Sequence, residues 1–201
     1  MTDLLDVLVL GGGQSGLATG YFLRRTSRAF AILDGETGPG GAWRHGWDSL
    51  HLFSPAEWSS LPGWMMPATP DGAYPDRDAV LAYMAAYEQR YALPVERPVE
   101  ILSVRRDADV FLVETDQGVR RSRALVAATG TWRKPFVPDY PDRERFQGLQ
   151  IHSAAYRNAQ PFAGKRVLVI GGGNSGAQIL AEVSQVADVT WVTPQEPMFC
   201  R

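Results

Sequence analysis

The stretch VLVLGGGQSGLA, residues 7–18, decides the fold, and it recurs as VLVIGGGNSGAQ at residues 167–178. Each copy is a short apolar run followed by GxGxxG and the start of a helical pattern. A buried strand, a tight glycine turn and a helix form the unit that binds dinucleotides. One GxGxxG is a weak indication, because glycine is common. Two copies in the same context predict two dinucleotide-binding units in one chain.

The first copy has the features of a complete dinucleotide site. Its first glycine permits the tight turn, its second lets the backbone approach a pyrophosphate, and its third allows close packing of helix and strand. The N–H groups that begin the helix attract phosphate. The predicted cofactor-binding residues are Gly11, Gly13, Gln14, Ser15 and Gly16, with the three glycines at the pyrophosphate. Asp34 ends the next predicted strand, where a carboxylate can accept hydrogen bonds from a ribose diol, and Gly35 after it is also predicted to bind the cofactor. The first site therefore fits the adenosine of FAD.

The second copy differs at the corresponding strand end. Its predicted nucleotide-binding residues are Gly171, Gly173, Asn174, Ser175 and Gly176. Pro194 stands where the first copy has Asp34, and a neutral end suits the 2′-phosphate of NADPH because a carboxylate would repel it. Arg201 is the only cation nearby, so Pro194-Gln195 leaves the choice between NADPH and NADH open.

Composition excludes several classes of function. The chain has 201 residues with a formal net charge of −2, which argues against a nucleic-acid binder. No apolar run approaches the about 18 residues of a membrane span, and the opening MTDLLD lacks the pattern of a signal peptide, which predicts a cytoplasmic protein. The single cysteine, Cys200, excludes a CxxC pair, and we assign it no chemistry. No histidine or cysteine spacing indicates a metal site.

The pattern along the chain predicts an α/β fold: a Rossmann-like domain with a parallel sheet and an antiparallel meander, then a second, incomplete Rossmann-like domain. A helix capped by Asp76 follows an irregular segment at 35–75, and three meander strands at 98–123 precede a buried strand at 124–128. In the first unit the helical pattern places Leu17 and Phe22 on one face. The predicted divisions are an FAD-binding domain at 1–134, a connector at 135–163 and the start of an NAD(P)H-binding domain at 164–201.

Three further segments carry a family resemblance. They are GPGGAW at residues 38–43, ATG at residues 128–130 and FQGLQIHSAAY at residues 146–156. The last fits the pattern FxGxxxHxxx(F/Y) at every fixed position. On these motifs and both glycine turns, the chain resembles the class B flavin-containing monooxygenases. The segment WDSLHLFSP, residues 47–55, is most similar to small bacterial members, including those of arsenic-resistance operons.

The resemblance implies an enzyme that uses FAD, NADPH and O2 to transfer one oxygen atom to a soft heteroatom of a small molecule, acting as a possible homodimer. It adds Gly40, Gly41, Trp43, Thr129 and Gly130 to the cofactor-binding residues, and it makes His152 and Tyr156 the catalytic candidates. On its own, His152 is typical of a buried or capping histidine, and Trp43 of a core aromatic. Two other functions remain open: an NAD(P)H-dependent flavoprotein reductase, and a flavin-binding module without turnover.

Overall fold

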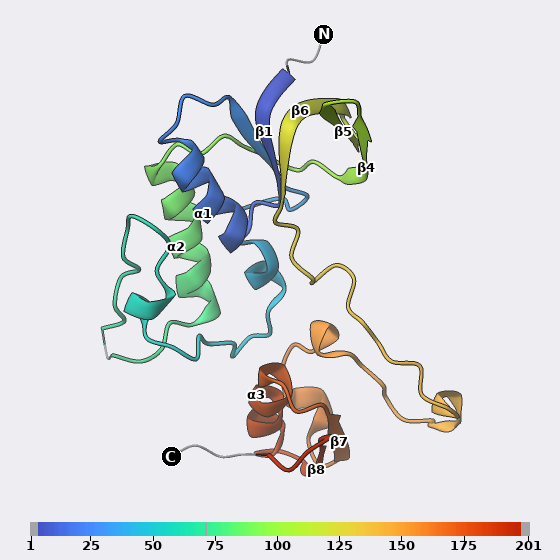
Figure 1. Ribbon diagram of the computed structural model, residues 1–201. Coiled ribbons are helices and arrows are strands. Elements are labelled where there is room, and N and C mark those ends of the chain that lie inside the picture. The colour runs from blue at the N-terminus through green and yellow to red at the C-terminus, as the bar shows by residue number, and fades with distance from the viewer. Residues whose placement is uncertain (1–3, 71, 198–201) are drawn as a thin grey trace. The chain divides into compact units, whose positions relative to one another are not determined.

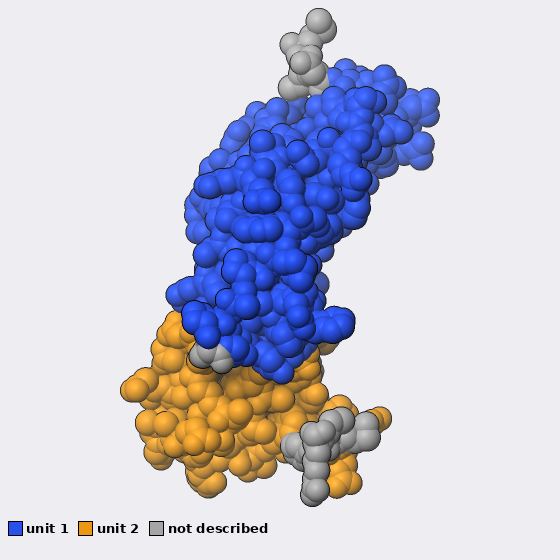
Figure 2. All heavy atoms as spheres, turned by 90° about the vertical axis from the view of Figure 1, so that its left-hand side faces the viewer, with its two compact units in different colours: residues 1–46, 50–133 blue, residues 47–49, 134–201 orange. Residues whose placement is uncertain are grey.

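The computed structural model describes residues 4–70 and 72–197, so Cys200 and Arg201 lie outside the described residues. The chain divides into two compact units (Figure 2). Unit 1 comprises residues 1–46 and 50–133. Unit 2 comprises residues 134–201 together with Trp47–Ser49, a short piece that the sequence analysis places in the first domain.

Unit 1 is built on a six-stranded sheet in the order β3-β2-β1-β6-β5-β4 (Figure 1). The strands are β1 (Leu4–Leu10), β2 (Phe30–Leu33), β3 (Val95–Glu96), β4 (Ile101–Asp107), β5 (Val110–Thr115) and β6 (Gly118–Ala127). The pairs β3-β2, β2-β1 and β1-β6 are parallel, whereas β6-β5 and β5-β4 are antiparallel. This arrangement confirms the predicted parallel sheet with an antiparallel meander.

One long strand, β6, replaces two predicted strands. The last meander strand before residue 123 and the buried strand at 124–128 were predicted as separate strands, but β6 continues from one into the other. Its first half pairs with β5 and its second half with β1, and the two pairings overlap at Arg121 and Ser122, of which Ser122 pairs with Phe111 and with Leu5. Ser122 is fully buried, and its hydroxyl donates to the carbonyl of Ala124. A polar residue satisfied inside the sheet therefore lets the strand continue where the sequence indicates a break.

One helix packs on the parallel part of this sheet, and a second helix packs against the first. Between β1 and β2 lies α1 (Gln14–Leu23), and α2 (Arg77–Arg90) begins at Asp76, whose carboxylate accepts from the N–H of Ala79 at 2.7 Å, as predicted. The predicted apolar face of α1 is wrong in one respect, since Phe22 is 56% exposed. Gly20 faces the sheet instead, so close to β2 that a Cβ there would lie 2.8 Å from Ile32 Cδ1.

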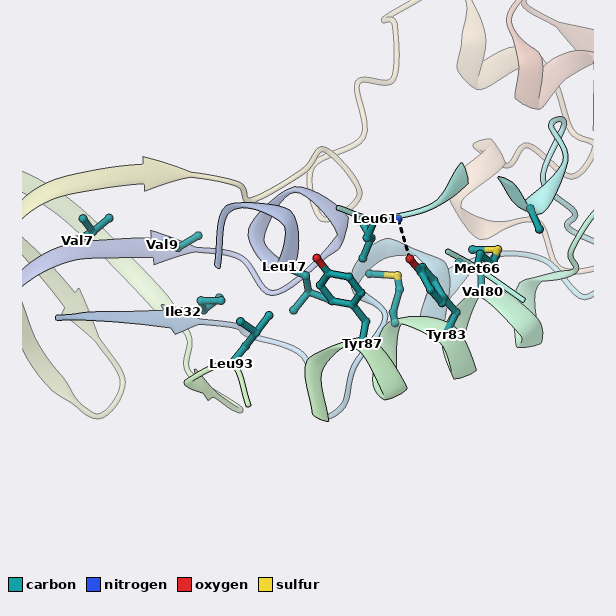
Figure 3. Packing of buried hydrophobic residues seen from close by; sticks show 12 residues of the cluster. Val7, Val9, Leu17, Ile32, Leu61, Met66, Val80, Tyr83, Tyr87 and Leu93 are labelled. Carbon is teal, nitrogen blue, oxygen red and sulfur yellow. Dashed lines mark hydrogen bonds between the residues drawn. The ribbon is translucent and has the colours of Figure 1, made fainter. Parts of the chain in front are cut away.

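The irregular segment is held against α2 by tyrosine hydroxyls (Figure 3). Tyr83 accepts from the N–H of Leu61 at 2.7 Å and donates to the carbonyl of Trp64, and Tyr87 donates to the carbonyl of Pro62. Both side chains are buried in the main apolar cluster of unit 1. The segment itself contains two 3-10 helices, Gly41–His45 and Ala56–Ser59.

Unit 2 repeats the opening of unit 1 as β7 (Arg166–Ile170), α3 (Asn174–Val183) and β8 (Asp188–Val192), with β7 and β8 parallel. Before them come the 3-10 helices Arg143–Arg145, Ser153–Ala155 and Gln160–Phe162. As predicted, this is the start of a second Rossmann-like unit. In the part of the chain that the structure describes, no helix has the length and apolar character to cross a bilayer.

Candidate dinucleotide-binding sites

The first glycine turn has the backbone that its motif predicts. Gly11 has φ +109°, a conformation that favours glycine, and its N–H donates to the carbonyl of Leu33 at 2.7 Å. A Cβ on Gly16 would lie 1.9 Å from the carbonyl oxygen of Gly11, so helix and turn can approach only if residue 16 is glycine. Gly13 is the N-cap of α1 and brings no side chain to its first N–H groups. Those donors remain available to a phosphate.

Two other predicted segments meet this turn. A Cβ on Gly41 would lie 2.8 Å from the Cα of Gly13, and one on Gly11 would lie 2.2 Å from the carbonyl oxygen of Ala128. The structure therefore brings together the first turn, the GGAW segment and the ATG segment. Trp43 is half-buried, whereas Thr129 and Gly130 are exposed beside the turn.

Asp34 lies beside the turn but is not free of partners. A Cβ on Gly12 would lie 2.6 Å from Asp34 Oδ2, so the carboxylate reaches the middle of the GGG run. Arg97 donates from Nε to this same oxygen at 2.8 Å and from Nη1 to Glu88 Oε1 at 2.7 Å. Arg97, which follows β3, was not predicted, because no motif or spacing marks it. The only local indication was Gly12, because the motif GxGxxG does not require glycine at that position and a side chain there would contact Arg97.

The Arg97 guanidinium stays charged in this site. Burial alone would lower the pKa of Arg97, but hydrogen bonds to Glu88 and Asp34 outweigh burial and raise that pKa above its ordinary value. A buried charge needs such partners, because it has lost its hydration. The group is thus one cation between two carboxylates.

The second glycine turn reproduces the geometry of the first. Gly171 has φ +124°, its N–H donates to the carbonyl of Val192 at 2.9 Å, and a Cβ on Gly176 would lie 2.5 Å from the carbonyl oxygen of Gly171. Gly173 is the N-cap of α3, with Asn174 and Ser175 following it. Beside Gly172 lie a methyl group of Thr193 and the ring of Pro194, where the first turn has a carboxylate.

A cavity of about 290 Å³ opens beside the first turn within unit 1. Gln14 and Trp43 line it at the turn, and the rest of its wall is mostly apolar, with Phe53, Trp58, Met66 and Met84 beside aliphatic side chains and two serines. Tyr83 also lines it, but its hydroxyl is engaged by Leu61 and Trp64. The cavity is therefore an apolar space with few polar groups that could orient a ligand.

His152 and Tyr156 both lie in unit 2 with the second turn. The Nδ1 of His152 accepts from the N–H of Ala154 at 3.1 Å, so the imidazole caps a 3-10 helix. Tyr156 is 2% exposed and packs between the rings of Trp47 and Phe162. Burial, with the nearby carboxylate of Glu182, raises the pKa of Tyr156 well above its ordinary value, so its phenol is neutral near pH 7.

Comparison with known proteins agrees with this geometry. Residues 8–200 match the pyridine nucleotide-disulphide oxidoreductase family, which covers nearly the whole chain. The chain belongs to the pyridine nucleotide-disulphide oxidoreductases. Within this family of oxidoreductases its relatives are flavin-containing monooxygenase-like proteins, which confirms the resemblance drawn from the motifs.

Relatives of this chain include bacterial and plant proteins. A flavin-containing monooxygenase from Stenotrophomonas maltophilia is 56% identical with a TM-score of 0.96, covering 100% of this chain and 61% of its own. An uncharacterized CzcO-like oxidoreductase of Geobacillus kaustophilus is 38% identical over 94% of this chain and 54% of its own length. The indole-3-pyruvate monooxygenase YUCCA4 of Oryza sativa is 32% identical over 98% of this chain. The chain spans about half the length of these curated relatives, 54% and 50%.

Flavin monooxygenases of this family use FAD and NADPH. The two turns fit such cofactors, because each combines a glycine cradle that a Cβ would fill with an uncapped helix start. Among the described residues no group of three or more histidine, cysteine, aspartate or glutamate side chains could hold a metal ion. The role of each residue in these sites stays a prediction.

Proposed function

We propose that the protein is an FAD- and NADPH-dependent monooxygenase that transfers one oxygen atom of O2 to sulfur, nitrogen or arsenic in a small molecule. The observation that carries this proposal is the pair of glycine turns, which share one backbone geometry but end in different side chains. Asp34 ends the strand beside the first turn, whereas Thr193 and Pro194 follow the strand beside the second. A dinucleotide whose adenosine ribose keeps its 2′-hydroxyl suits the first strand end, and one with a 2′-phosphate suits the second.

In this proposal the first turn holds FAD. Gly11, Gly13 and Gly16 let the backbone approach the pyrophosphate, and Asp34 accepts from the adenosine ribose. When bound, the flavin supplies the redox chemistry, taking electrons from NADPH and passing them to O2. The apolar walls of the cavity at Trp43 and Met84 exclude water from the substrate.

The cavity favours an apolar substrate of modest size. Its volume of about 290 Å³ is close to the lower end, roughly 300 Å³, of small-molecule pockets. Aromatic rings and methionine sulfur atoms make favourable contacts with a polarizable atom. A thioether, an amine or trivalent arsenic attached to a small apolar group fits this chemistry, whereas a highly charged substrate would lose hydration without gaining partners.

His152 has a positioning role in this proposal. Its Nδ1 is occupied by the N–H of Ala154, which leaves Nε2 as the nitrogen that can reach a ligand. We expect His152→Ala to slow reduction of the flavin or to increase release of hydrogen peroxide while FAD stays bound. Stopped-flow reduction and a peroxide assay measure the two effects, and unchanged values for both would contradict the assignment.

The decisive experiment follows cofactors and oxygen together. Purified protein is expected to be yellow, to release FAD on denaturation, and to consume O2 as NADPH is oxidised, with an oxygenated thioether, amine or arsenic product seen by mass spectrometry. Fast NADPH oxidation by an artificial acceptor without O2 consumption would favour the reductase. Bound FAD without any NADPH oxidation would favour the module without turnover. A cytoplasmic location and a homodimer stay predictions.

Asp34 gives a test of the FAD site itself. Asp34→Ala removes a buried carboxylate, so FAD should bind more weakly by about 1.5–3 kcal/mol through lost charge-assisted hydrogen bonds. The measurement is a titration of apoprotein with FAD, followed by quenching of the flavin fluorescence. If the unmodified protein cannot be reconstituted with FAD, the proposal is wrong.

A further inference from the structure

We propose that Arg97 is the positioning residue of the FAD site, holding the Asp34 carboxylate in the orientation that accepts the ribose hydroxyl. This inference rests on the proposed role of Asp34. Arg97 is bound on two sides, by Asp34 through Nε and by Glu88 of α2 through Nη1. Its side chain is only 9% exposed, so the guanidinium is held in place and has little contact with solvent.

Arg97 donates a hydrogen bond to one carboxylate oxygen of Asp34 and does not contact the other. The Nε contact takes Oδ2 at 2.8 Å, whereas Oδ1 has one long contact of 3.4 Å from the N–H of Glu36. A carboxylate oxygen can accept two hydrogen bonds. Oδ1 therefore keeps the capacity to accept from a hydroxyl, and the bond to Arg97 fixes the plane in which it does so.

The third nitrogen of the guanidinium connects this group to the glycine turn. Arg97 Nη2 is buried and has no hydrogen-bond partner within residues 4–70 and 72–197. It lies 2.9 Å from the position that a Cβ on Gly12 would occupy. Leaving a buried donor unmatched destabilises a protein, so each such donor in a native structure calls for an explanation. The guanidinium is packed directly against the turn predicted to hold the pyrophosphate.

Charge gives a second reason for an arginine here. Asp34 and Glu88 are two carboxylates beside a site for an anionic dinucleotide, and both are largely buried, with side chains 7% and 17% exposed. Without a cation between them they would repel each other and the pyrophosphate. Arg97 offsets one of these charges, and its planar fork does so while fixing direction, which the point charge of a lysine cannot.

A purely structural strap between α2 and the sheet would have a different signature. Loss of a strap weakens binding of every flavin dinucleotide equally, whereas loss of orientation at Asp34 removes discrimination at the ribose. The probe is therefore FAD compared with an analogue in which hydrogen replaces the adenosine 2′-hydroxyl. Apoprotein of the full chain is titrated with each compound, and the ratio of the two dissociation constants is the readout.

We expect unmodified protein to bind FAD about tenfold or more tightly than the analogue, as for a hydrogen bond to a charged group. Arg97→Met should bring this ratio to within about twofold of one. Arg97→Lys keeps the buried positive charge and should preserve the fold better, but without the fork it should also lose the ratio. Arg106→Met is the matched control, because Arg106 is exposed on the edge strand β4 and contacts the Ala108 carbonyl and the Phe111 ring.

The outcomes separate the inference from its basis. A wild-type ratio in Arg97→Lys means that charge alone suffices and overturns the positioning role, even if Arg97→Met does not fold. A wild-type ratio in Arg97→Met, with weaker binding of both compounds, indicates a strap and overturns it as well. An unchanged ratio in Asp34→Ala would instead overturn the proposed contact of Asp34 with the ribose.

Discussion

Leu8 of β1 is fully buried, whereas Leu168, at the same place in β7, is 61% exposed. The two strands have nearly the same sequence and lead into glycine turns with the same hydrogen bond to the neighbouring strand. Their surroundings differ, because β1 lies between β2 and β6, while β7 pairs with β8 alone among the described strands. The motif thus specifies the local backbone, and the neighbouring strands specify burial.

The glycine turns separate these two influences further. Gly11 and Gly171 both have positive φ, as the motif requires in either unit. Gly12 and Gly172 lie between the fixed glycines, and their surroundings are not part of the motif. A side chain at Gly12 would collide with Asp34 and Arg97, whereas one at Gly172 would meet Thr193 and Pro194 at ordinary distances of 3.5–3.9 Å.

The largest difference should appear in the strands. Leu8→Ala leaves a cavity in a packed sheet and should lower the free energy of unfolding by about 2–5 kcal/mol. Leu168→Ala removes an exposed side chain and should change it by less than about 0.5 kcal/mol. Chemical denaturation of both variants measures the difference. Equal losses would mean that Leu168 is buried in the protein in solution and would break the comparison.

Glycine-to-alanine substitutions at the middle of each turn should give a smaller difference. Gly12→Ala must displace the buried ion pair of Asp34 and Arg97, so we expect a loss of stability of about 2 kcal/mol and weaker retention of FAD. Gly172→Ala has room for its methyl group and should cost less than about 0.5 kcal/mol. Thermal unfolding and FAD content after gel filtration test both, and a stable, flavin-loaded Gly12→Ala would contradict the crowding at this turn.

The sequence predicted the parts of the fold that depend on neighbouring residues. Each glycine turn joins a strand to a helix as expected, and Asp76 caps α2. The continuity of β6 was missed because it depends on two different partner strands, neither of which is visible in the run of residues 118–127. Phe22 was misplaced for a similar reason, since the close approach of α1 at Gly20 selects a different face.

The same division applies to the candidate sites. Gly11, Gly16 and Asp34 could be found from a local pattern, and resemblance supplied the GGAW and ATG segments that the structure brings to the first turn. Arg97 could not be found in this way, because its role arises from contacts with Asp34 and Glu88, which are distant in the sequence. The grouping of Trp47–Ser49 with unit 2 likewise depends on long-range contacts, such as that of Asp48 with Asn158.

The smallest expected effect comes from giving the second turn the strand end of the first. Pro194→Asp places a carboxylate beside Gly172, where the proline ring now lies. If the second turn binds NADPH, that carboxylate repels the 2′-phosphate, and the dissociation constant for NADPH should rise about tenfold, or about 1.4 kcal/mol. NADH has ribose hydroxyls that can donate to the new carboxylate, so its binding should hold or improve.

A neutral control isolates the charge in this last test. Pro194→Ala removes the ring without adding a carboxylate and should leave the ratio of NADPH to NADH binding unchanged. Both nucleotides are titrated against each variant while reduction of the flavin is followed at high and low salt, since screening weakens the repulsion of exposed charges. If Pro194→Asp weakens NADPH and NADH equally, the strand end does not contact the ribose. The second turn would then share the backbone of the first without sharing its means of selecting a nucleotide.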